Sequence, residues 1–240
     1  MEDGISIFTP SRAPPGVVRR AAQTVGQAFR EDPYMDVFDV PPRQRPTLFA
    51  AIARFVLRQH RHEPCLYVAQ GGDAVAVAVP AGSKPLEGRF DAYLSGLWWQ
   101  AVRMPPAPRA ALLQFLHDVT RAGPDAAAAE GVAATRALIF IATAPALRGT
   151  GWGRRLLARV TADADAAGEP LQLEASDTGV AALYARYGFT PIGTLDVRGP
   201  GPRREARIPL MLRRPGGGGG GAREEAAAAA AAAEGPAAAV

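Results

Sequence analysis

The stretch "RGTGWGRRLL", Arg148 to Leu157, decides the fold: three glycines occupy five positions and a helix-forming run follows at once. The apolar run before it, residues 135–143, is typical of a buried strand, so the glycines lie in a strand-to-helix turn. The first turn of a helix has unpaired backbone N–H groups and a partial positive charge. Glycines leave these groups uncovered, and Arg148, Arg154 and Arg155 add positive charge. The turn therefore indicates a phosphate or pyrophosphate site, although a plain tight turn would explain one or two of the glycines.

Two common nucleotide-binding motifs match this turn poorly. A P-loop needs Gly-Lys followed by Ser or Thr, and here Arg154 follows Gly153. The Rossmann pattern G-x-G-x-x-G needs its third glycine where Arg154 stands. Glu174, at the end of the next predicted strand, stands about where a ribose-binding acid belongs. A nucleotide-dependent oxidoreductase with a degenerate Rossmann turn therefore stays open, although the chain has a single convincing βαβ unit.

Composition favours a cytoplasmic protein. Hydrophobic residues at 48% and charged residues at 21% are globular values. The net charge is +4 and the pI about 9.7, but the arginines are scattered, so we expect no nucleic-acid partner. A single cysteine, Cys65, fits a reducing compartment. No apolar run reaches the ~18 residues of a membrane span, and no signal-peptide core is present, so we expect no membrane association.

The chain divides into a domain over residues 1–214 and a tail over residues 215–240. The tail begins with six consecutive glycines and continues into an alanine block. These residues have no side chains that could bury enough surface to offset the entropy of ordering them. We therefore expect the tail to be flexible and to lie outside the fold.

Hydrophobic periodicity predicts an α+β (α/β-type) fold with a central mixed, mostly antiparallel sheet. The predicted helices are residues 16–32, 45–60, 151–167 and 178–188, with residues 85–122 broken by prolines into two further pieces. The predicted strands are residues 5–8, a hairpin over 65–80, and 135–143, 171–175, 189–197 and 205–212.

Two motifs carry a resemblance to a known family. The stretch "ATAPALRGTGWGRRLL" resembles the acetyl-CoA-binding motif of the GNAT N-acetyltransferases, through Pro145, Arg148, Gly149, Gly151 and Gly153. The stretch "LEASDTGVAALYARYGF" resembles the closing motif of the same family, through Leu183, Tyr184, Gly188 and Phe189. Thr143 stands where valine is usual and Asp177 where asparagine is common. Both motifs in this order form a specific signal.

The resemblance implies one GNAT-like domain with helices on both faces of the sheet and two splayed parallel strands at the cofactor site. Acetyl-CoA, the co-substrate, would enter between strands 136–143 and 171–175, with its pyrophosphate on the glycine turn. A primary amine would attack the thioester directly in a ternary complex. The implied cofactor-binding residues are Ile141, Ala142, Thr143, Arg148, Gly149, Thr150, Gly151, Trp152, Gly153, Arg154 and Asp177.

The resemblance also makes Tyr184 the candidate general acid, since a phenol can protonate a departing thiolate. Without the motif, an aromatic residue packed in the core would be the better interpretation. Glu174 is the candidate base that deprotonates the amine, against a solvated strand-end acid or a helix-cap partner. A chain of water molecules would serve as well.

Early helices and insertions wall the acceptor pocket in this family, so Asp32, Tyr34, Trp98 and Trp99 are candidates to line it. We expect at least one of the adjacent tryptophans to be buried packing, because neighbours on a helix diverge by about 100°. His60, His62 and Cys65 lack metal-ligand spacing, so we expect no metal. The acceptor is a small-molecule or protein amine and the protein a monomer or homodimer. A non-catalytic acyl-CoA-binding module is the alternative.

Overall fold

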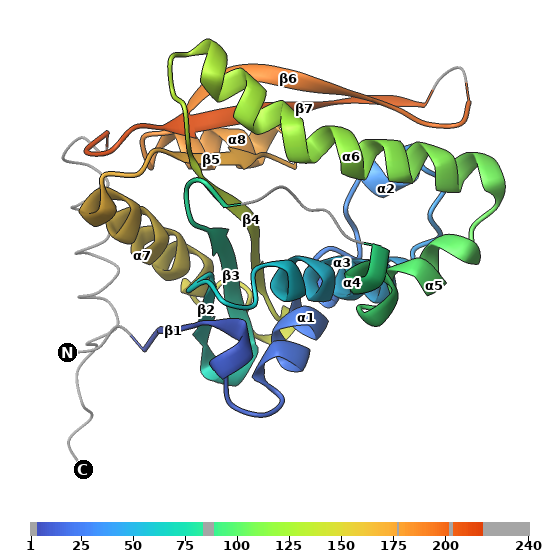
Figure 1. Ribbon diagram of the computed structural model, residues 1–240, viewed down its shortest axis with the longest axis horizontal. Coiled ribbons are helices and arrows are strands. Elements are labelled where there is room, and N and C mark those ends of the chain that lie inside the picture. The colour runs from blue at the N-terminus through green and yellow to red at the C-terminus, as the bar shows by residue number, and fades with distance from the viewer. Residues whose placement is uncertain (1–3, 84–88, 177, 202–203, 218–240) are drawn as a thin grey trace.

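Seven strands form one sheet in the order β1-β2-β3-β4-β5-β7-β6 in the computed structural model, which describes residues 4–83, 89–176, 178–201 and 204–217 (Figure 1). The strands are β1 (Ser6–Phe8), β2 (Leu66–Ala69), β3 (Ala74–Val79), β4 (Arg136–Thr143), β5 (Leu171–Glu174), β6 (Thr190–Arg198) and β7 (Glu205–Arg213). In this part of the chain β4 and β5 are the one parallel pair. The prediction of a mixed, mostly antiparallel sheet is confirmed, and a doubly wound Rossmann sheet is excluded.

Helices cover both faces of the sheet, as predicted. The α-helices are α1 (Val17–Ala28), α2 (Tyr34–Val37), α3 (Arg45–Gln59), α4 (Arg89–Leu94), α5 (Leu97–Val102), α6 (Pro106–Ala129), α7 (Trp152–Ala167) and α8 (Thr178–Ala185). Short 3₁₀ turns occupy Pro10–Arg12, Gln70–Gly72 and Pro145–Leu147. One hydrophobic core includes residues of α1, α3 and α6, and a second includes residues of α7 and α8.

The sequence of β3, "AVAVAV", shows how one strand serves both cores. Its valines belong to the core of α1 and α3, and its alanines belong to the core of α7. All six side chains are buried. Because successive side chains of a strand point to opposite faces, the small residues give α7 room to pack closely against the sheet.

The segment between β3 and β4 differs from its prediction. We predicted two helical pieces ending at residue 122, and the structure has three helices, of which α6 continues to Ala129. Pro106 begins α6 at a position where proline is favourable, but Pro124 lies inside the helix. Four alanines after Asp125 have the highest helix propensity and continue the helix past that proline. The four-residue helix α2 was not predicted either, because it is too short to show a period.

A bulge in β4 shapes the middle of the sheet. Val77 of β3 pairs with Phe140 and Ala78 with Leu138, so Ile139 is an extra residue without a partner on β3. A bulge bends its strand and increases the local twist. On the other edge, β4 pairs with β5 at Arg136 and Ala137 alone. Beyond these residues the two strands diverge (Figure 1), which confirms the prediction of splayed parallel strands.

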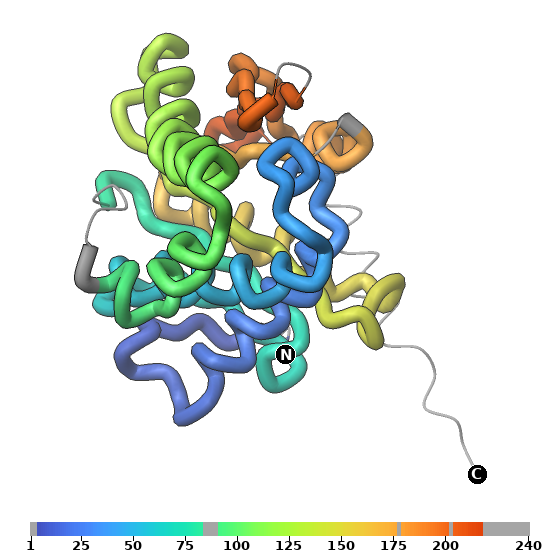
Figure 2. The backbone as a smooth tube through the Cα atoms, turned by 90° about the vertical axis from the view of Figure 1, so that its right-hand side faces the viewer, coloured from blue at the N-terminus to red at the C-terminus, as the bar shows by residue number. Residues whose placement is uncertain are grey.

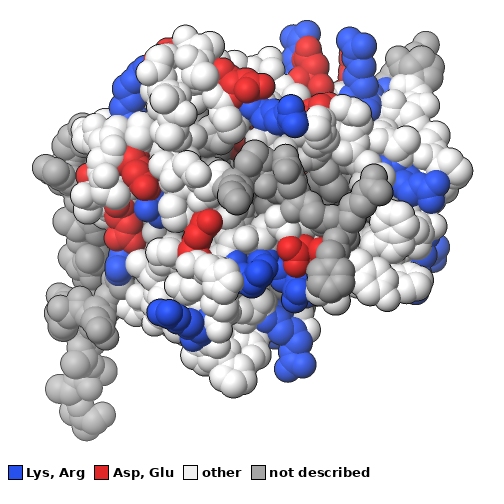
Figure 3. All heavy atoms as spheres, in the orientation of Figure 1, with Lys and Arg blue, Asp and Glu red and all other residues white. Residues whose placement is uncertain are grey.

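The surface shows no concentration of one charge on the face in Figure 3, where acidic and basic side chains are interspersed. Within the described ranges, no helix is both long and apolar enough to cross a bilayer. The predicted tail lies outside the described residues from position 218 onward.

An ion pair between the buried Arg213 and the partly exposed Asp165 holds the end of β7 against α7. The guanidinium of Arg213 donates two hydrogen bonds of 2.7 Å to the Asp165 carboxylate and one of 2.8 Å to the carbonyl of Tyr187. The Arg213 side chain is 4% exposed. Asp165 also accepts a hydrogen bond from the backbone N–H of Gly216. Asp165 of α7 therefore binds both the last strand, through Arg213, and the chain after it, through Gly216.

We predict that Asp165→Ala lowers the free energy of unfolding by about 2–4 kcal/mol, because it leaves the buried Arg213 charge without its carboxylate. The pair Asp196–Arg207 is the control, since its side chains are 64% and 81% exposed. Asp196→Ala should cost about 0.5 kcal/mol or less. Urea denaturation measures both, and equal losses would contradict the stabilising role of the buried pair.

Candidate functional site

The turn between β4 and α7 leaves the first turn of α7 open. Gly149 and Gly151 have φ of 80° and 86°, which disfavour side chains. No protein atom lies within 4 Å of the position of a Cβ on either glycine. Gly151 is the N-cap of α7 and makes no side-chain capping bond. The backbone N–H groups at the start of α7 are therefore available to an anion, whereas the Thr150 N–H donates to the carbonyl of Leu147.

Arginines surround the turn. Arg148 and Arg154 are exposed, and Arg148 donates a hydrogen bond of 3.4 Å to the carbonyl of Ala28 at the end of α1. The guanidinium of Arg155 lies 4.8 Å from the ring centroid of Trp152, a cation–π arrangement. Thr150 donates its hydroxyl hydrogen to the carbonyl of Leu147 and so closes the turn.

The end of β4 has one edge that β5 does not cover. Ile141, Ala142 and Thr143 pair with β3, and the ladder to β5 has already ended at Ala137. Residues of a strand turn their N–H and C=O groups alternately to the two edges, so an extended ligand can pair with this one. Asp177, the last predicted cofactor residue, lies outside the described residues.

A cavity of about 670 Å³ lies on the face of the sheet that α1, α3 and α6 cover, between the diverging β4 and β5. Ala137, Ile139 and Phe140 of β4 contribute to its wall. It brings together four of the predicted site residues: Asp32, Tyr34, Trp98 and Glu174. Trp99, Tyr184 and the residues of the glycine turn do not line it.

Glu174 ends β5 and turns its side chain to this cavity, as does Gln172, while Leu173 between them belongs to the opposite core. Burial raises the pKa of Glu174 from its ordinary value of 4.5 to about 7. No arginine or lysine pairs with it among the described residues. A Cβ on Gly123 of α6 would lie 2.8 Å from Gln172 Nε2 and 2.9 Å from Glu174 Oε1. Glycine at this position therefore makes room for the carboxyl.

Asp32 and Tyr34 lie at the same end of the cavity as Glu174. The Tyr34 hydroxyl lies 3.2 Å from the carbonyl oxygen of Ala175, the residue after Glu174, and 3.3 Å from that of Arg207. The Tyr34 backbone N–H donates a hydrogen bond of 2.9 Å to the Asp32 carboxylate. Burial raises the pKa of Asp32 to about 6. Two carboxyl groups with raised pKa values therefore line the cavity.

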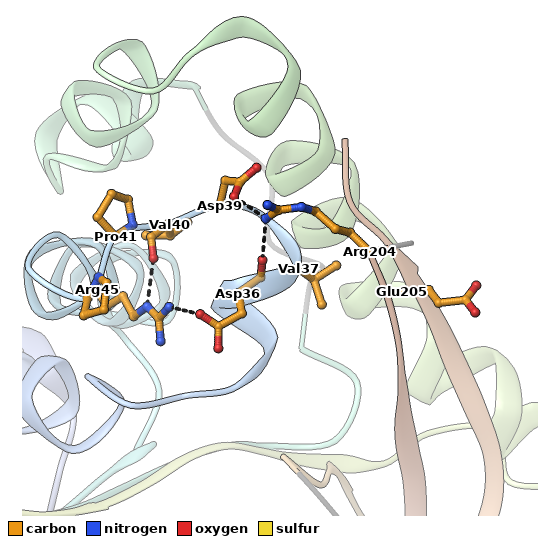
Figure 4. Close-up of a pocket in the computed structure, with 9 residues that line it drawn as sticks. Asp36, Val37, Asp39, Val40, Pro41, Arg45, Arg204 and Glu205 are labelled. Atoms are coloured by element: carbon orange, nitrogen blue, oxygen red, sulfur yellow. Dashed lines mark hydrogen bonds and ion pairs between the residues drawn. The ribbon is translucent and has the colours of Figure 1, made fainter. Parts of the chain in front are cut away.

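Two arginines that the sequence analysis missed hold this segment in place (Figure 4). The buried Arg45 donates to the carbonyls of Val40 and Asp32 and pairs with the Asp36 carboxylate. Arg204 donates to the carbonyl of Asp36 and pairs with Asp39. A signal for Arg45 was present, because a cation is unfavourable in the first turn of a helix unless another group neutralises it.

The segment around α2 also packs against α6. The centroids of the Phe38 and Phe115 rings lie 5.1 Å apart. Figure 2 shows the segment around α2, in light blue, beside the green helix α6. A second pocket, drawn in Figure 4, is lined by Asp36, Asp39, Arg45 and Arg204, which already bind one another, and by Glu205. We interpret these contacts as support for the α2 segment and not as a ligand site.

Tyr184 lies in the core on the other face of the sheet, where it is 7% exposed and its ring lies 5.7 Å from that of Phe189. Burial raises its pKa to about 12. Its hydroxyl makes no hydrogen bond to any described residue. This position suits packing, and it leaves the hydroxyl proton available.

Neither adjacent tryptophan is buried, which corrects our expectation for this pair. Trp98 is 54% exposed and Trp99 51% exposed. Their divergence on α5 puts Trp98 in the cavity wall and Trp99 beside Tyr93, with ring centroids 6.3 Å apart.

His60 and Cys65 make contacts within the protein. His60 Nδ1 lies 3.1 Å from the Glu63 carboxylate, and the Cys65 thiol donates to the His60 carbonyl.

Residues 119–191 match the family model described as the acetyltransferase (GNAT) domain. This segment is therefore similar to the GNAT acetyltransferase domain. This segment contains the open turn, both diverging strands and Tyr184. A search of curated proteins by sequence finds no match.

Solved structures share the GNAT fold over most of this chain. Polyamine N-acetyltransferase from Drosophila melanogaster is 18% identical, with a TM-score of 0.57 over 88% of this chain and 99% of that one. Arylalkylamine N-acetyltransferase 2 from Aedes aegypti is 12% identical, with a TM-score of 0.52 over 88% and 98%. The Corynebacterium glutamicum structure described as histone acetyltransferase HPA2 and related acetyltransferase is 19% identical, with a TM-score of 0.53 over 88% and 97%.

We predict that Glu174→Gln changes how the stability of the protein depends on pH. Between about pH 4.5 and pH 7 the folded state binds more protons at Glu174 than the unfolded state, so the free energy of unfolding falls as pH rises. The variant lacks this loss. Its free energy of unfolding should therefore exceed that of the wild type by up to about 3 kcal/mol above pH 7. Below pH 4.5 the ionisation of Glu174 should contribute no difference.

Urea denaturation at several pH values measures the difference. The exposed Glu205 is the control, and Glu205→Gln should leave the pH dependence unchanged. A constant difference between Glu174→Gln and the wild type across the range would contradict a raised pKa.

Proposed function

We propose that the protein is an acetyl-CoA-dependent N-acetyltransferase that moves an acetyl group to a primary amine by direct attack within a ternary complex. One observation carries the proposal: β4 and β5 pair over two residues and then diverge beside the uncapped glycine turn at the N-terminus of α7. This gives an extended ligand an open strand edge and its anionic end a set of backbone donors.

The residues of the turn fit acetyl-CoA as substrate. Gly149 and Gly151 leave the space that Cβ atoms would fill, and a Cβ on Gly153 would lie 3.7 Å from Thr143 Oγ1. The N–H groups from Gly151 to Arg154, with the Arg148 guanidinium, would bind the pyrophosphate, while the Thr150 N–H donates to the carbonyl of Leu147. Ile141, Ala142 and Thr143 would bind the pantetheine arm through the free edge of β4. Acetyl-CoA supplies the thioester that is attacked.

Glu174 serves as the base in this proposal. An amine is protonated near neutral pH and must lose a proton to attack. A carboxyl with a pKa of about 7 is ionised often enough to take that proton and basic enough to hold it. Asp32, at the same end of the cavity, would hold the ammonium form by charge.

Tyr184 serves as the acid. When the nitrogen–carbon bond forms and the carbon–sulfur bond breaks, the departing thiolate needs one proton. The Tyr184 hydroxyl makes no hydrogen bond to a described residue and keeps its proton up to high pH, because burial raises its pKa to about 12. Amine acetylation by structural relatives, which are described as polyamine and arylalkylamine N-acetyltransferases, supports the same reaction class here.

We predict that Gly151→Asp weakens acetyl-CoA binding by about tenfold or more, because the new carboxylate faces the pyrophosphate. Gly151→Asn is the matched control: it has the same shape, tolerates a positive φ equally and adds no charge. Gly168→Asp places the same carboxylate at the other end of α7, at φ of 65°. Calorimetric titration with acetyl-CoA, and with NAD⁺ as the competing ligand, measures all three. Equal affinities of the Asp and Asn variants would separate the turn from the pyrophosphate.

We predict that Tyr184→Phe lowers turnover by about 10²-fold while acetyl-CoA affinity stays near that of the wild type. The deficit should be the same from about pH 7 to pH 10, because the phenol stays protonated throughout. Tyr187→Phe, which changes a buried neighbour in the same core, is the control. Release of CoA thiol in the presence of an amine panel measures turnover. Wild-type turnover in a folded Tyr184→Phe variant would exclude Tyr184 as the acid.

A further inference from the structure

The cavity beside Glu174 is lined by two carboxyl groups. Asp32 and Glu174 are its charged side chains among the described residues, apart from its histidines, and the Tyr34 hydroxyl connects their two segments. The remaining wall holds a few uncharged polar groups, such as Thr120 and Gln172, and is otherwise apolar.

Helix α6 forms a long apolar wall of this cavity. Leu112, Phe115, Leu116 and Val119 recur at the three- and four-residue spacing of one helix face. The other residues of α6 that line the cavity are Leu113, His117, Thr120 and Pro124. Across the cavity, α3 contributes Phe49, Ile52 and Phe55. Protein interiors are normally packed without voids of this size, so two apolar walls around about 670 Å³ favour an apolar occupant.

Helix α6 gives an estimate of the length of the cavity. Gly123 lies against Glu174, and Leu113, which also lines the cavity, precedes it by ten residues on α6. At about 1.5 Å per residue, these positions are about 15 Å apart. Leu113 and Trp98 are 45% and 54% exposed, so the far end opens to solvent between apolar side chains.

We infer that the acceptor is a primary amine on a long apolar body without a second charge, bound with its amine at Asp32 and Glu174 and its apolar part along α6 toward Trp98. This inference rests on the proposed amine acetylation. Burial of the apolar part removes apolar surface from water and so stabilises the complex. A second ammonium group along the same wall would lose its hydration without a partner, which disfavours a polyamine.

Two probes with the same carbon chain distinguish an apolar amine from a diamine as the preferred acceptor. Octylamine and 1,8-diaminooctane differ by one distal ammonium group, and butylamine is the short apolar control. We expect kcat/KM for octylamine to exceed the values for both others by about tenfold or more. Equal or better use of the diamine, or no dependence on chain length, would overturn the inference.

Two variants test the location of the apolar part, and both change exposed residues that the fold does not need. Trp98→Ala should lower kcat/KM for octylamine about fivefold or more and leave butylamine unchanged. Trp99→Ala is the matched control, since this tryptophan is equally exposed but lies outside the cavity wall. Leu113→Glu should shift the octylamine-to-diamine ratio about tenfold toward the diamine, because the new carboxylate meets the distal ammonium. Equal effects of the two tryptophan variants would contradict the proposed position.

Binding without turnover distinguishes failure of this inference from failure of the proposed function. If no amine releases CoA thiol although acetyl-CoA binds, the acetyltransferase proposal fails. Calorimetric titration of the free protein then decides the inference by itself. Tighter binding of octylamine than of 1,8-diaminooctane, weakened by Trp98→Ala, supports it, and no preference for octylamine overturns it.

Discussion

The short pairing between β4 and β5 is the constraint on which the site depends. Ile139 is one residue too many for the ladder to β3, and a strand that absorbs such a residue bends and twists. Two hydrogen-bonded residue pairs hold β4 to β5 before they separate. The separation opens the edge of β4 near the glycine turn, and on the α6 side it leaves the cavity that Glu174 faces. One irregularity in a ladder therefore accounts for both halves of the candidate site.

A cavity of this size removes apolar packing contacts, and hydrogen bonds and ion pairs hold its walls in place instead. Arg45 and Arg204 fix the α2 segment through backbone carbonyls and carboxylates, where a larger core would have used apolar contacts. Tyr34 then connects that segment to the end of β5. On the opposite side, Gly123 lets α6 approach Glu174 closely enough to bury its carboxyl. Burial of that group lowers stability above neutral pH, and the same burial gives it the proton affinity of a base.

The two predicted proton-transfer residues lie on different faces of the sheet. Tyr184 belongs to the core of α7, and Glu174 faces the cavity on the other side. Because β4 and β5 diverge at this level, a reaction centre between them is accessible from both faces. This arrangement is consistent with a base that acts on the amine from one side and an acid that acts on the thiolate from the other.

The amino-acid sequence by itself determined the elements with strong local signals. The alternation in β3, the apolar run of β4, the glycine turn and the period of α7 are each encoded within a few residues, so their places and the mixed sheet could be predicted. The cavity could not be predicted, because its wall is made by side chains from several helices and from β3, β4, β5 and β7, which are far apart in the sequence. The roles of Arg45 and Gly123 and the different environments of Trp98 and Trp99 could not be predicted either, because they depend on contacts between elements that are distant in the sequence. Local pattern specifies which face of a helix is apolar, and only the tertiary structure decides whether that face meets a core or a ligand.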